Sequence, residues 1–224
     1  MKDIFLLDVD DTLLDFAKGE RAQIASTLAH FGIAPTPRMA QRFHEINDGL
    51  WKRLERGELT RERLLILRFE LFFEEFGLKG DAAAFNALYF EGLSSRAYLI
   101  DGAAAFLRTL RQRGRLFTVT NGSAYIQRRR TALAGIDGFF EEMFISETVG
   151  CNKPSPAYAA YVASHIEGFS RERAVWMGDS LTSDRLCAAA MGVDFILFGR
   201  ERPAGYDGLF ADGYPAALGL IGGL

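Results

Sequence analysis

Short apolar runs alternate with helix-like stretches along most of the chain. Runs with the length of buried strands lie at residues 3–7, 116–119, 143–145, 174–177 and 193–198. The stretches between the later runs have the spacing of helices and lie at about 103–113, 124–133, 156–166 and 182–191. Because strands and helices follow one another regularly, the pattern predicts an α/β fold with a Rossmann-like, doubly wound parallel sheet.

The stretch from Phe16 to Arg96 has a different character, because its apolar positions follow helical spacing throughout. Glycine and proline interrupt it at 32–37, at 57 and at 77–81, which predicts several separate helices. We therefore expect two domains. Residues 1–15 and 97–224 form the α/β core, and residues 16–96 form an inserted, all-helical cap.

Local signals within the inserted stretch agree with helices. Thr36 before Pro37, and Thr60 before Arg61, are typical of helix N-caps. An aromatic stripe at helical spacing precedes the helix-terminating Gly77 and comprises Phe69, Phe72, Phe73 and Phe76. The preference of phenylalanine for protein cores favours burial of this stripe between helices over the lining of a ligand pocket.

Composition and charge disfavour several classes of function. The chain has 224 residues, 49% of them hydrophobic, and 26 Lys and Arg against 29 Asp and Glu, so no basic field attracts a nucleic-acid polymer. The two cysteines, Cys151 and Cys187, are expected to be free and reduced. The first apolar run stops at Asp8, too early for a signal peptide, and no later run has the length of a membrane span. We expect a cytoplasmic protein without a membrane partner, and the sequence does not indicate its oligomeric state.

Polar motifs follow or flank these apolar runs. They are Asp8-Val9-Asp10-Asp11-Thr12, Thr120-Asn121-Gly122, Lys153-Pro154, and Gly178-Asp179-Ser180 with Asp184. Because the carboxyl ends of parallel strands meet at one edge of a sheet, the motifs are expected to converge. Together they predict a magnesium-dependent phosphohydrolase.

Each motif supplies a part of that chemistry. Asp8 offers a nucleophilic carboxylate, and Asp179 offers the hard oxygen ligand that Mg²⁺ prefers. Asp184 is expected to hold a metal-bound water or to orient Lys153, whose positive charge offsets the carboxylates. The hydroxyl of Thr120 and the backbone N–H of Asn121 suit phosphoryl oxygens.

These motifs, in this order and spacing, resemble those of the haloacid dehalogenase superfamily over essentially the whole chain. The resemblance implies that Asp8 forms an aspartyl phosphate and that Asp10 exchanges protons with the leaving oxygen and with water. It also implies phosphoryl binding by Thr120, Asn121 and Lys153. The expected metal group comprises Asp8, Asp10, Asp179 and Asp184. Members that remove halide lack the second acid of the first motif, so Asp10 favours phosphate chemistry.

The inserted helices resemble the cap of bacterial phosphatases that act on pyrimidine nucleoside monophosphates and on noncanonical nucleotides. The likeness lies in residues 47–51, 57–60 and 68–69. Within it, Trp51 either stacks on a base or packs between helices, and both alternatives stay open. The basic run Arg128-Arg129-Arg130 is interpreted as a solvated helix face.

The expected function is hydrolysis of a small phosphorylated metabolite, with nucleoside 5'-monophosphates as the first choice. Alternatives are a sugar-phosphate phosphatase, a phosphomutase that passes the phosphoryl group to another hydroxyl, or a noncatalytic interaction module. Haloacid dehalogenation is disfavoured by Asp10.

Overall fold

The protein forms two compact units in the computed structural model, which describes residues 1–224. One unit combines Met1–Asp15 with Ala97–Leu224, and the other is Phe16–Arg96. None of the helices in the chain combines the length and the apolar content needed to cross a lipid bilayer.

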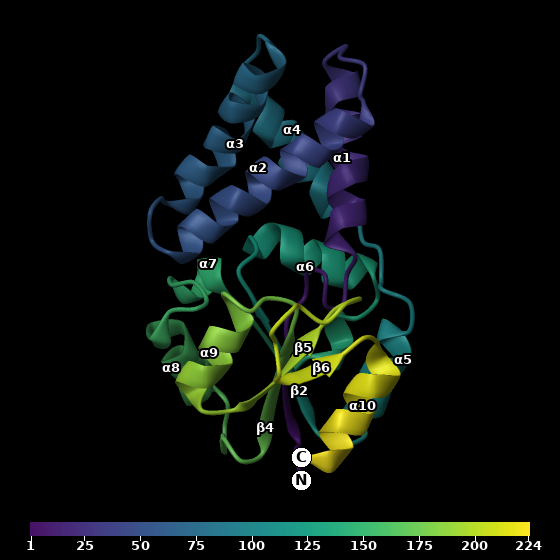
Figure 1. The fold of residues 1–224 in the computed structure, drawn as a ribbon, viewed down its shortest axis with the longest axis vertical. Coiled ribbons are helices and arrows are strands. Elements are labelled where there is room, and N and C mark those ends of the chain that lie inside the picture. Colours follow the sequence, from purple (N-terminus) through teal and green to yellow (C-terminus); the bar gives the residue numbers. More distant parts are fainter. The chain divides into compact units, whose positions relative to one another are not determined.

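The first unit is built on a six-stranded sheet in which every neighbouring pair is parallel (Figure 1). Its strands are β1 (Ile4–Leu7), β2 (Arg115–Thr120), β3 (Glu142–Ile145), β4 (Ala174–Gly178), β5 (Asp194–Phe198) and β6 (Leu209–Ala211). The spatial order is β3-β2-β1-β4-β5-β6, so the winding reverses beside β1. In such sheets, ligands bind outside the carboxyl ends of the strands at this reversal.

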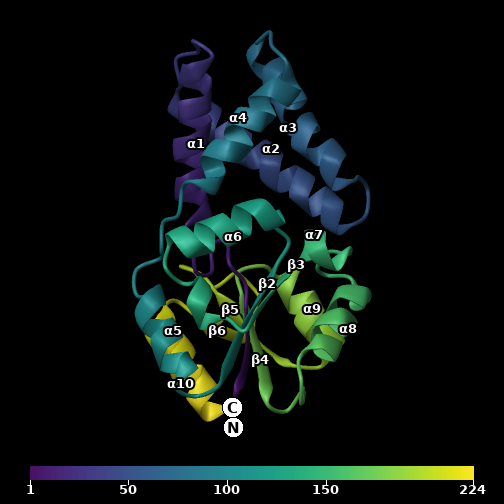
Figure 2. The ribbon, with the colours of Figure 1, turned by 180° about the vertical axis from the view of Figure 1, so that it is seen from behind.

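Helices cover both faces of the sheet, as Figure 2 shows. The helices of this unit are α5 (Ala103–Arg111), α6 (Ala124–Leu133), α7 (Ser146–Val149), α8 (Pro156–His165), α9 (Asp184–Met191) and α10 (Tyr214–Gly223), with a short 3-10 helix at Asp137–Phe139. Alternate side chains of β1 enter opposite cores. Phe5 and Leu7 pack with α5 and α10, whereas Ile4 and Leu6 pack with α8 and α9. The predicted doubly wound fold is therefore confirmed.

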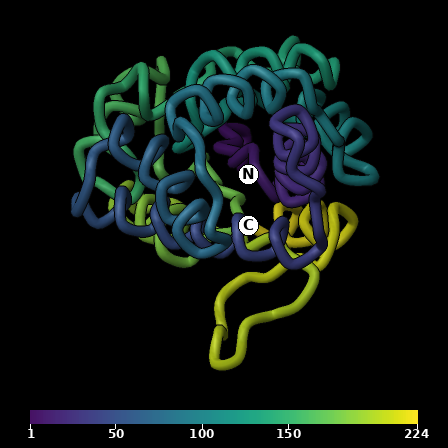
Figure 3. Tube along the Cα trace, turned by 90° about the horizontal axis from the view of Figure 1, so that it is seen from above, coloured from purple at the N-terminus to yellow at the C-terminus, as the bar shows by residue number.

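The end of the first unit was not expected from the sequence. Strand β6 and helix α10 were not predicted, and both complete one core of the sheet. The segment between β5 and β6 extends from the rest of its unit as a long loop (Figure 3). Arg202 ties this loop together, because its Nη1 donates to the carbonyl oxygens of Tyr206 and Gly208 at 3.1 and 2.8 Å.

The second unit consists of four helices, α1 (Phe16–His30), α2 (Pro37–Glu55), α3 (Arg61–Phe76) and α4 (Ala82–Ser94). The two predicted N-caps are confirmed, because Thr36 and Thr60 each accept a hydrogen bond from a backbone N–H of the first turn, at 3.2 and 3.3 Å. Gly77 ends α3 in the left-handed conformation, at φ 62°.

The aromatic stripe of α3 forms the core of this second unit. Phe69, Phe72 and Phe73 are buried, and Phe76 is half-buried. The ring of Phe43 lies 5.1 Å from that of Phe69 and 5.7 Å from that of Phe72, between centroids. The prediction that the stripe packs between helices is confirmed.

Candidate active site

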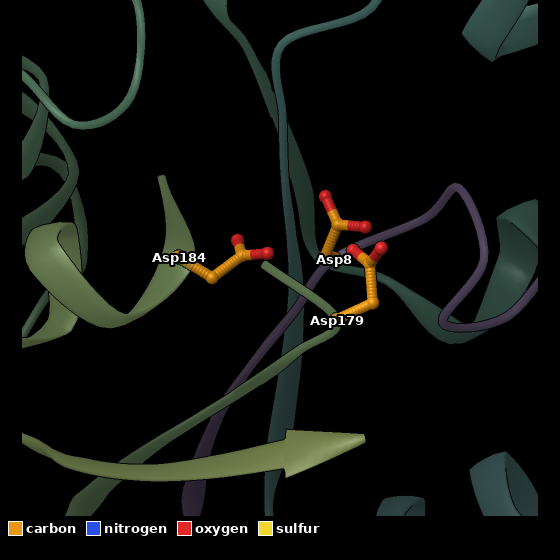
Figure 4. A group of neighbouring side chains, drawn as sticks. All are labelled: Asp8, Asp179 and Asp184. Atoms are coloured by element: carbon orange, nitrogen blue, oxygen red, sulfur yellow. The ribbon is translucent and has the colours of Figure 1, made fainter. Parts of the chain in front are cut away.

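Three acidic side chains of the first unit converge at the carboxyl edge of its sheet (Figure 4). Asp8 directly follows β1, Asp179 directly follows the neighbouring strand β4, and Asp184 begins α9. One carboxylate oxygen of each lies within 4.8 Å of the others. The parallel pairing of β1 with β4 thus brings together acids that are far apart in the sequence.

Lys153 lies against this group and is almost fully buried. Its Nζ donates to Asp8 Oδ1 and to Asp184 Oδ1, both at 2.7 Å, and to the carbonyl oxygen of Val119 at 2.8 Å. The ammonium of Lys153 has three hydrogens, and these three acceptors of the protein use all of them. Lys153 therefore acts here as a positive charge and as a brace between the two carboxylates.

Negative charge is crowded despite this lysine. Desolvation raises the pKa of Asp8 to about 8; Lys153 opposes that shift and Asp184 adds to it. Solvent reaches Asp179, yet the surrounding protein desolvates it and, together with Asp8 and Asp184, raises its pKa well above the usual range. Burial opposes the charge of Lys153, but Asp184 and Asp8 outweigh it and raise the pKa of the ammonium. Three oxygen donors and uncompensated negative charge fit a hard divalent cation.

Besides Lys153, two further groups donate hydrogen bonds to the carboxylate of Asp184. The indole Nε1 of the buried Trp176 donates to Oδ1 at 3.1 Å, and the backbone N–H of Ser180 donates to Oδ2 at 3.2 Å. A Cβ on Gly178 would lie 2.3 Å from the carboxyl carbon of Asp184, so only glycine leaves room for this carboxylate. The glycine of the Gly178-Asp179 motif is therefore needed because any larger side chain would collide with Asp184.

Thr120 and Asn121 lie at the end of β2 and have different tasks. Thr120 Oγ1 accepts bonds from the N–H of Gly122 at 3.2 Å and from Gln127 at 2.9 Å. A hydroxyl that accepts twice still has its own hydrogen to donate. The Asn121 side chain donates to the carbonyl of Lys153 at 3.0 Å and accepts from its N–H at 2.8 Å. Asn121 thus fixes the loop that carries Lys153, a role that the sequence did not predict.

The side chain of Asp10 lies outside the group of three carboxylates that includes Asp8. It contacts α6, where Arg130 and Gln127 bind its two oxygens. The expectation that Arg128-Arg129-Arg130 forms a solvated face is correct for the first two residues and wrong for Arg130, which is fully buried. Successive helical residues point about 100° apart, so one member of a basic run can face inward.

The loop that carries the first motif is folded by its own backbone. The N–H groups of Leu13 and Leu14 both donate to the carbonyl oxygen of Val9, and Asp11 adopts the left-handed conformation at φ 55°. Aspartate tolerates this conformation better than most residues. From α10, the hydroxyl of Tyr214 donates to the carbonyl of Thr12 at 2.9 Å. Helix α10, which the sequence pattern did not predict, thus supports the candidate site.

Residues of the inserted unit that carried the resemblance have structural tasks there. The guanidinium of buried Arg68 donates to the side-chain oxygens of Asn47 and Asn86, at 3.1 and 2.7 Å, and lies 4.7 Å from the ring centroid of Tyr89. Asn47 in turn donates to buried Glu20 at 2.8 Å. This network joins all four helices of the unit.

Trp51 lies on α2 of the inserted unit and is half-buried. Its ring packs on a cluster that contains Leu50, Leu54 and Leu64, and the guanidinium of Arg61 lies 5.3 Å from a ring centroid. The two cysteines are free, as expected: Cys187 is buried and Cys151 is half-buried.

The chain is similar to known proteins over most of its length. It is 36% identical over 189 residues to the HAD-hydrolase YfnB of Bacillus subtilis, which covers 84% of this chain and 80% of that protein. It is 32% identical to the pyrimidine 5'-nucleotidase PynA of Streptococcus pneumoniae, over 86% of this chain and 82% of that one. The pyrimidine 5'-nucleotidase YjjG of Escherichia coli is 25% identical, over 91% and 90%.

The fold agrees with these similarities. The crystal structure of YfnB, described as bound to magnesium and as revealing interdomain movement, matches with a TM-score of 0.94 at 31% identity over 99% of both chains. The family model of the haloacid dehalogenase-like hydrolases matches residues 2–192, which contain every motif of the site. The chain therefore belongs to the haloacid dehalogenase-like hydrolases.

Proposed function

We propose that the protein is a Mg²⁺-dependent phosphomonoesterase that forms an aspartyl phosphate on Asp8. The observation that carries this proposal is the placement of the Asp8 carboxylate between a buried ammonium and two further acids. Lys153 binds one oxygen of Asp8, Oδ1, so the carboxylate keeps lone pairs for phosphorus and for a cation. An anionic nucleophile attacks a phosphate ester only where nearby positive charge offsets the repulsion.

The reaction has two steps on this chain's own residues. Asp8 attacks phosphorus while the bond from phosphorus to the ester oxygen breaks, and Asp10 gives that oxygen a proton. A water molecule then attacks the phosphorus of the aspartyl phosphate while Asp10 takes a proton from it, the bond from the Asp8 oxygen to phosphorus breaks, and inorganic phosphate leaves with the Asp8 carboxylate restored. The Thr120 hydroxyl and the Asn121 backbone N–H hold phosphoryl oxygens in both steps.

Mg²⁺ would be held by the carboxylates of Asp8, Asp179 and Asp184, together with a carbonyl of the loop after β1. Haloacid dehalogenase-like hydrolases generally use this ion, and the three carboxylates have the oxygen chemistry that it prefers. When bound, Mg²⁺ neutralises the phosphoryl group and the acids around it. The side chain of Asp10, held by α6, is not needed as a ligand.

Metal binding is expected to change the fluorescence of Trp176, whose indole donates to Asp184 and whose ring lies 5.9 Å from Lys153 Nζ. The chain has two tryptophans, so Trp51→Phe leaves Trp176 as the only one. Adding Mg²⁺ to this metal-free variant should give a saturable emission change, because the field around the indole changes. The same titration after a further Asp179→Asn change should need at least about tenfold more Mg²⁺. An unchanged midpoint would contradict Asp179 as a ligand.

We propose nucleoside 5'-monophosphates, pyrimidine ones first, as the substrates, and the helices of Phe16–Arg96 as the cap that selects them. Two relatives that match most of the chain are pyrimidine 5'-nucleotidases, which supports this choice. We propose that Trp51 contributes an aromatic face to the base. Stacking of this kind contributes about 1–3 kcal/mol per base.

A substrate panel tests the proposal. Phosphate release is measured for pyrimidine and purine nucleoside monophosphates, ribose 5-phosphate and glucose 6-phosphate, each with and without Mg²⁺. Pyrimidine monophosphates should exceed ribose 5-phosphate in kcat/KM by about 5- to 150-fold, the equivalent of one stacked base. Trp51→Ala should remove this advantage while leaving ribose 5-phosphate turnover within about twofold.

The outcomes separate the alternatives. A preference for sugar phosphates would replace the nucleotidase assignment by a sugar-phosphate phosphatase. Formation of an isomeric sugar phosphate without inorganic phosphate would indicate a phosphomutase. Absence of turnover for every ester with Mg²⁺ present would leave a noncatalytic module and would end the proposal.

A further inference from the structure

Helix α6 places two side chains against the two oxygens of the Asp10 carboxylate. Arg130 Nη1 donates to Oδ1 at 2.5 Å, and Gln127 Nε2 donates to Oδ2 at 2.7 Å. The side chain of Arg130 is 1% exposed, and that of Asp10 is 28% exposed. Because one bond is charge-assisted and each oxygen has its own donor, the two contacts fix the plane of the carboxylate.

Gln127 also joins Asp10 to Thr120 of the Thr120-Asn121-Gly122 motif. Its amide nitrogen donates to Thr120 Oγ1 at 2.9 Å, and its Oε1 accepts from Arg130 Nη1 at 3.4 Å. Acceptors at the nitrogen and a donor at the oxygen define which way the amide points. A Cβ on Gly122 would lie 2.3 Å from the Gln127 amide nitrogen, so glycine there leaves space for this link.

We propose that Arg130 and Gln127 are positioning residues that orient Asp10 for proton exchange, and this inference rests on the proposed phosphatase function. A carboxylate has about four lone-pair sites, and the two contacts occupy one on each oxygen. The remaining sites are then left to exchange a proton with the ester oxygen or with water, and the Asp10 side chain is exposed enough to be reached. Misplacement of a reacting group by about 1 Å costs on the order of 10²-fold in rate, so loss of the contact from Arg130 or Gln127 to Asp10 should lower the rate measurably.

The test compares esters that differ in their need for a proton. Arg130→Met is assayed in kcat/KM, which reports the first chemical step, with p-nitrophenyl phosphate and with a nucleoside monophosphate. The nitrophenolate leaves readily without protonation, whereas a ribose alkoxide does not. We expect a loss of about 10²-fold for the nucleotide and less than about tenfold for p-nitrophenyl phosphate. The neighbouring exposed residue provides a matched control, since Arg129→Met should change either value by less than about twofold.

A double-mutant cycle separates positioning from general damage to the fold. If Arg130 acts through Asp10, then Asp10→Asn with Arg130→Met should lose no more activity than Asp10→Asn alone. Arg130→Lys, which keeps the charge, should recover part of the nucleotide activity. If Arg130→Met does not fold, Gln127→Met is used instead; because Gln127 also contacts Thr120, the measure there is the ratio of the two losses, which should again be larger for the nucleotide.

Two results would overturn the inference while leaving the phosphatase proposal intact. One is an equal loss for both esters, and the other is additive losses in the double variant. If the unmodified protein hydrolyses neither ester, the proposed function itself fails, and this outcome is visible before any variant is made.

Discussion

Asp8→Asn is expected to reduce phosphate release by roughly 10⁴-fold or more, because loss of the nucleophile removes the covalent route altogether. The amide oxygen of asparagine can still accept from Lys153, which now donates to Asp8 Oδ1 at 2.7 Å, so the site should keep its shape. The measurement is phosphate release from p-nitrophenyl phosphate and from a nucleoside monophosphate at saturating Mg²⁺. Activity within tenfold of the unmodified protein would remove Asp8 from its proposed role.

The same variant has a second expected property, which shows that lost activity does not reflect lost structure. The pKa of Asp8 is raised to about 8 in the folded state, whereas an unfolded aspartate has a pKa of about 3.9. Between these values the folded state binds more protons than the unfolded state. The metal-free protein therefore loses stability as the pH rises from about 4 to about 8.

Asparagine resembles the protonated acid and avoids this loss. In EDTA at pH 8, Asp8→Asn should be more stable than the unmodified protein by about 0.5–2 kcal/mol, as measured by denaturant unfolding. At pH 4 to 5 the difference should shrink. A variant that is inactive and also less stable at pH 8 would indicate disruption of the site rather than loss of a nucleophile.

Much of the fold could be predicted because local patterns and the long-range arrangement agree. Each of the three apolar runs that become β1, β2 and β4 ends in a polar motif, and parallel pairing places those ends at one edge. Thr36, Thr60 and Gly77 mark helix ends through bonds made within a few residues. Such features depend on neighbours in the sequence, so the sequence is enough to find them.

The missed elements lack those local signals. Strand β6 has three residues, too few for a periodic pattern, and α10 contains three glycines that lower its helix propensity. Both are stabilised by packing against the sheet, where Tyr214 stacks on Phe106 and Phe198. Tertiary contact outweighs local preference at this end of the chain.

The supporting residues of the site were missed for a different reason. Gln127 and Arg130 occupy inward positions of α6 where hydrophobic periodicity predicts apolar side chains. The partner of Arg130 lies 120 residues away, at Asp10, and no composition or spacing rule connects the two. Trp176 likewise has the sequence pattern of an ordinary buried strand residue, and only the structure shows that its indole donates to Asp184. Sequence motifs therefore indicate the reacting groups, whereas the groups that orient them emerge only from the fold.

Lys153→Met is expected to destabilise the protein by about 3–5 kcal/mol in addition to abolishing turnover, because removal of one partner leaves buried charge without compensation. The lysine is the donor to both Asp8 and Asp184, and its side chain is 3% exposed. The deficit should also depend on pH. Lys153 is the main influence that lowers the pKa of Asp8, so its loss raises that pKa further above the unfolded value. The two proteins differ in the ionisation of Asp8 only once the pH rises through about 8, where Asp8 beside Lys153 loses its proton and Asp8 without Lys153 does not, so the deficit should be larger near a pH of about 9 than near a pH of about 5.

Denaturant unfolding of metal-free protein at both pH values measures this effect, and Lys52→Met is the matched control. Lys52 pairs with Asp48 on the surface at 2.7 Å, and both side chains are about half exposed, so its replacement should change stability by less than about 0.5 kcal/mol. Adding Asp8→Asn to Lys153→Met should recover part of the lost stability, because one buried charge is removed with its partner. A double variant that is less stable than Lys153→Met alone would show that Lys153 and Asp8 stabilise the fold independently. In that case, electrostatic pairing would not be the reason that this lysine is buried beside the nucleophile.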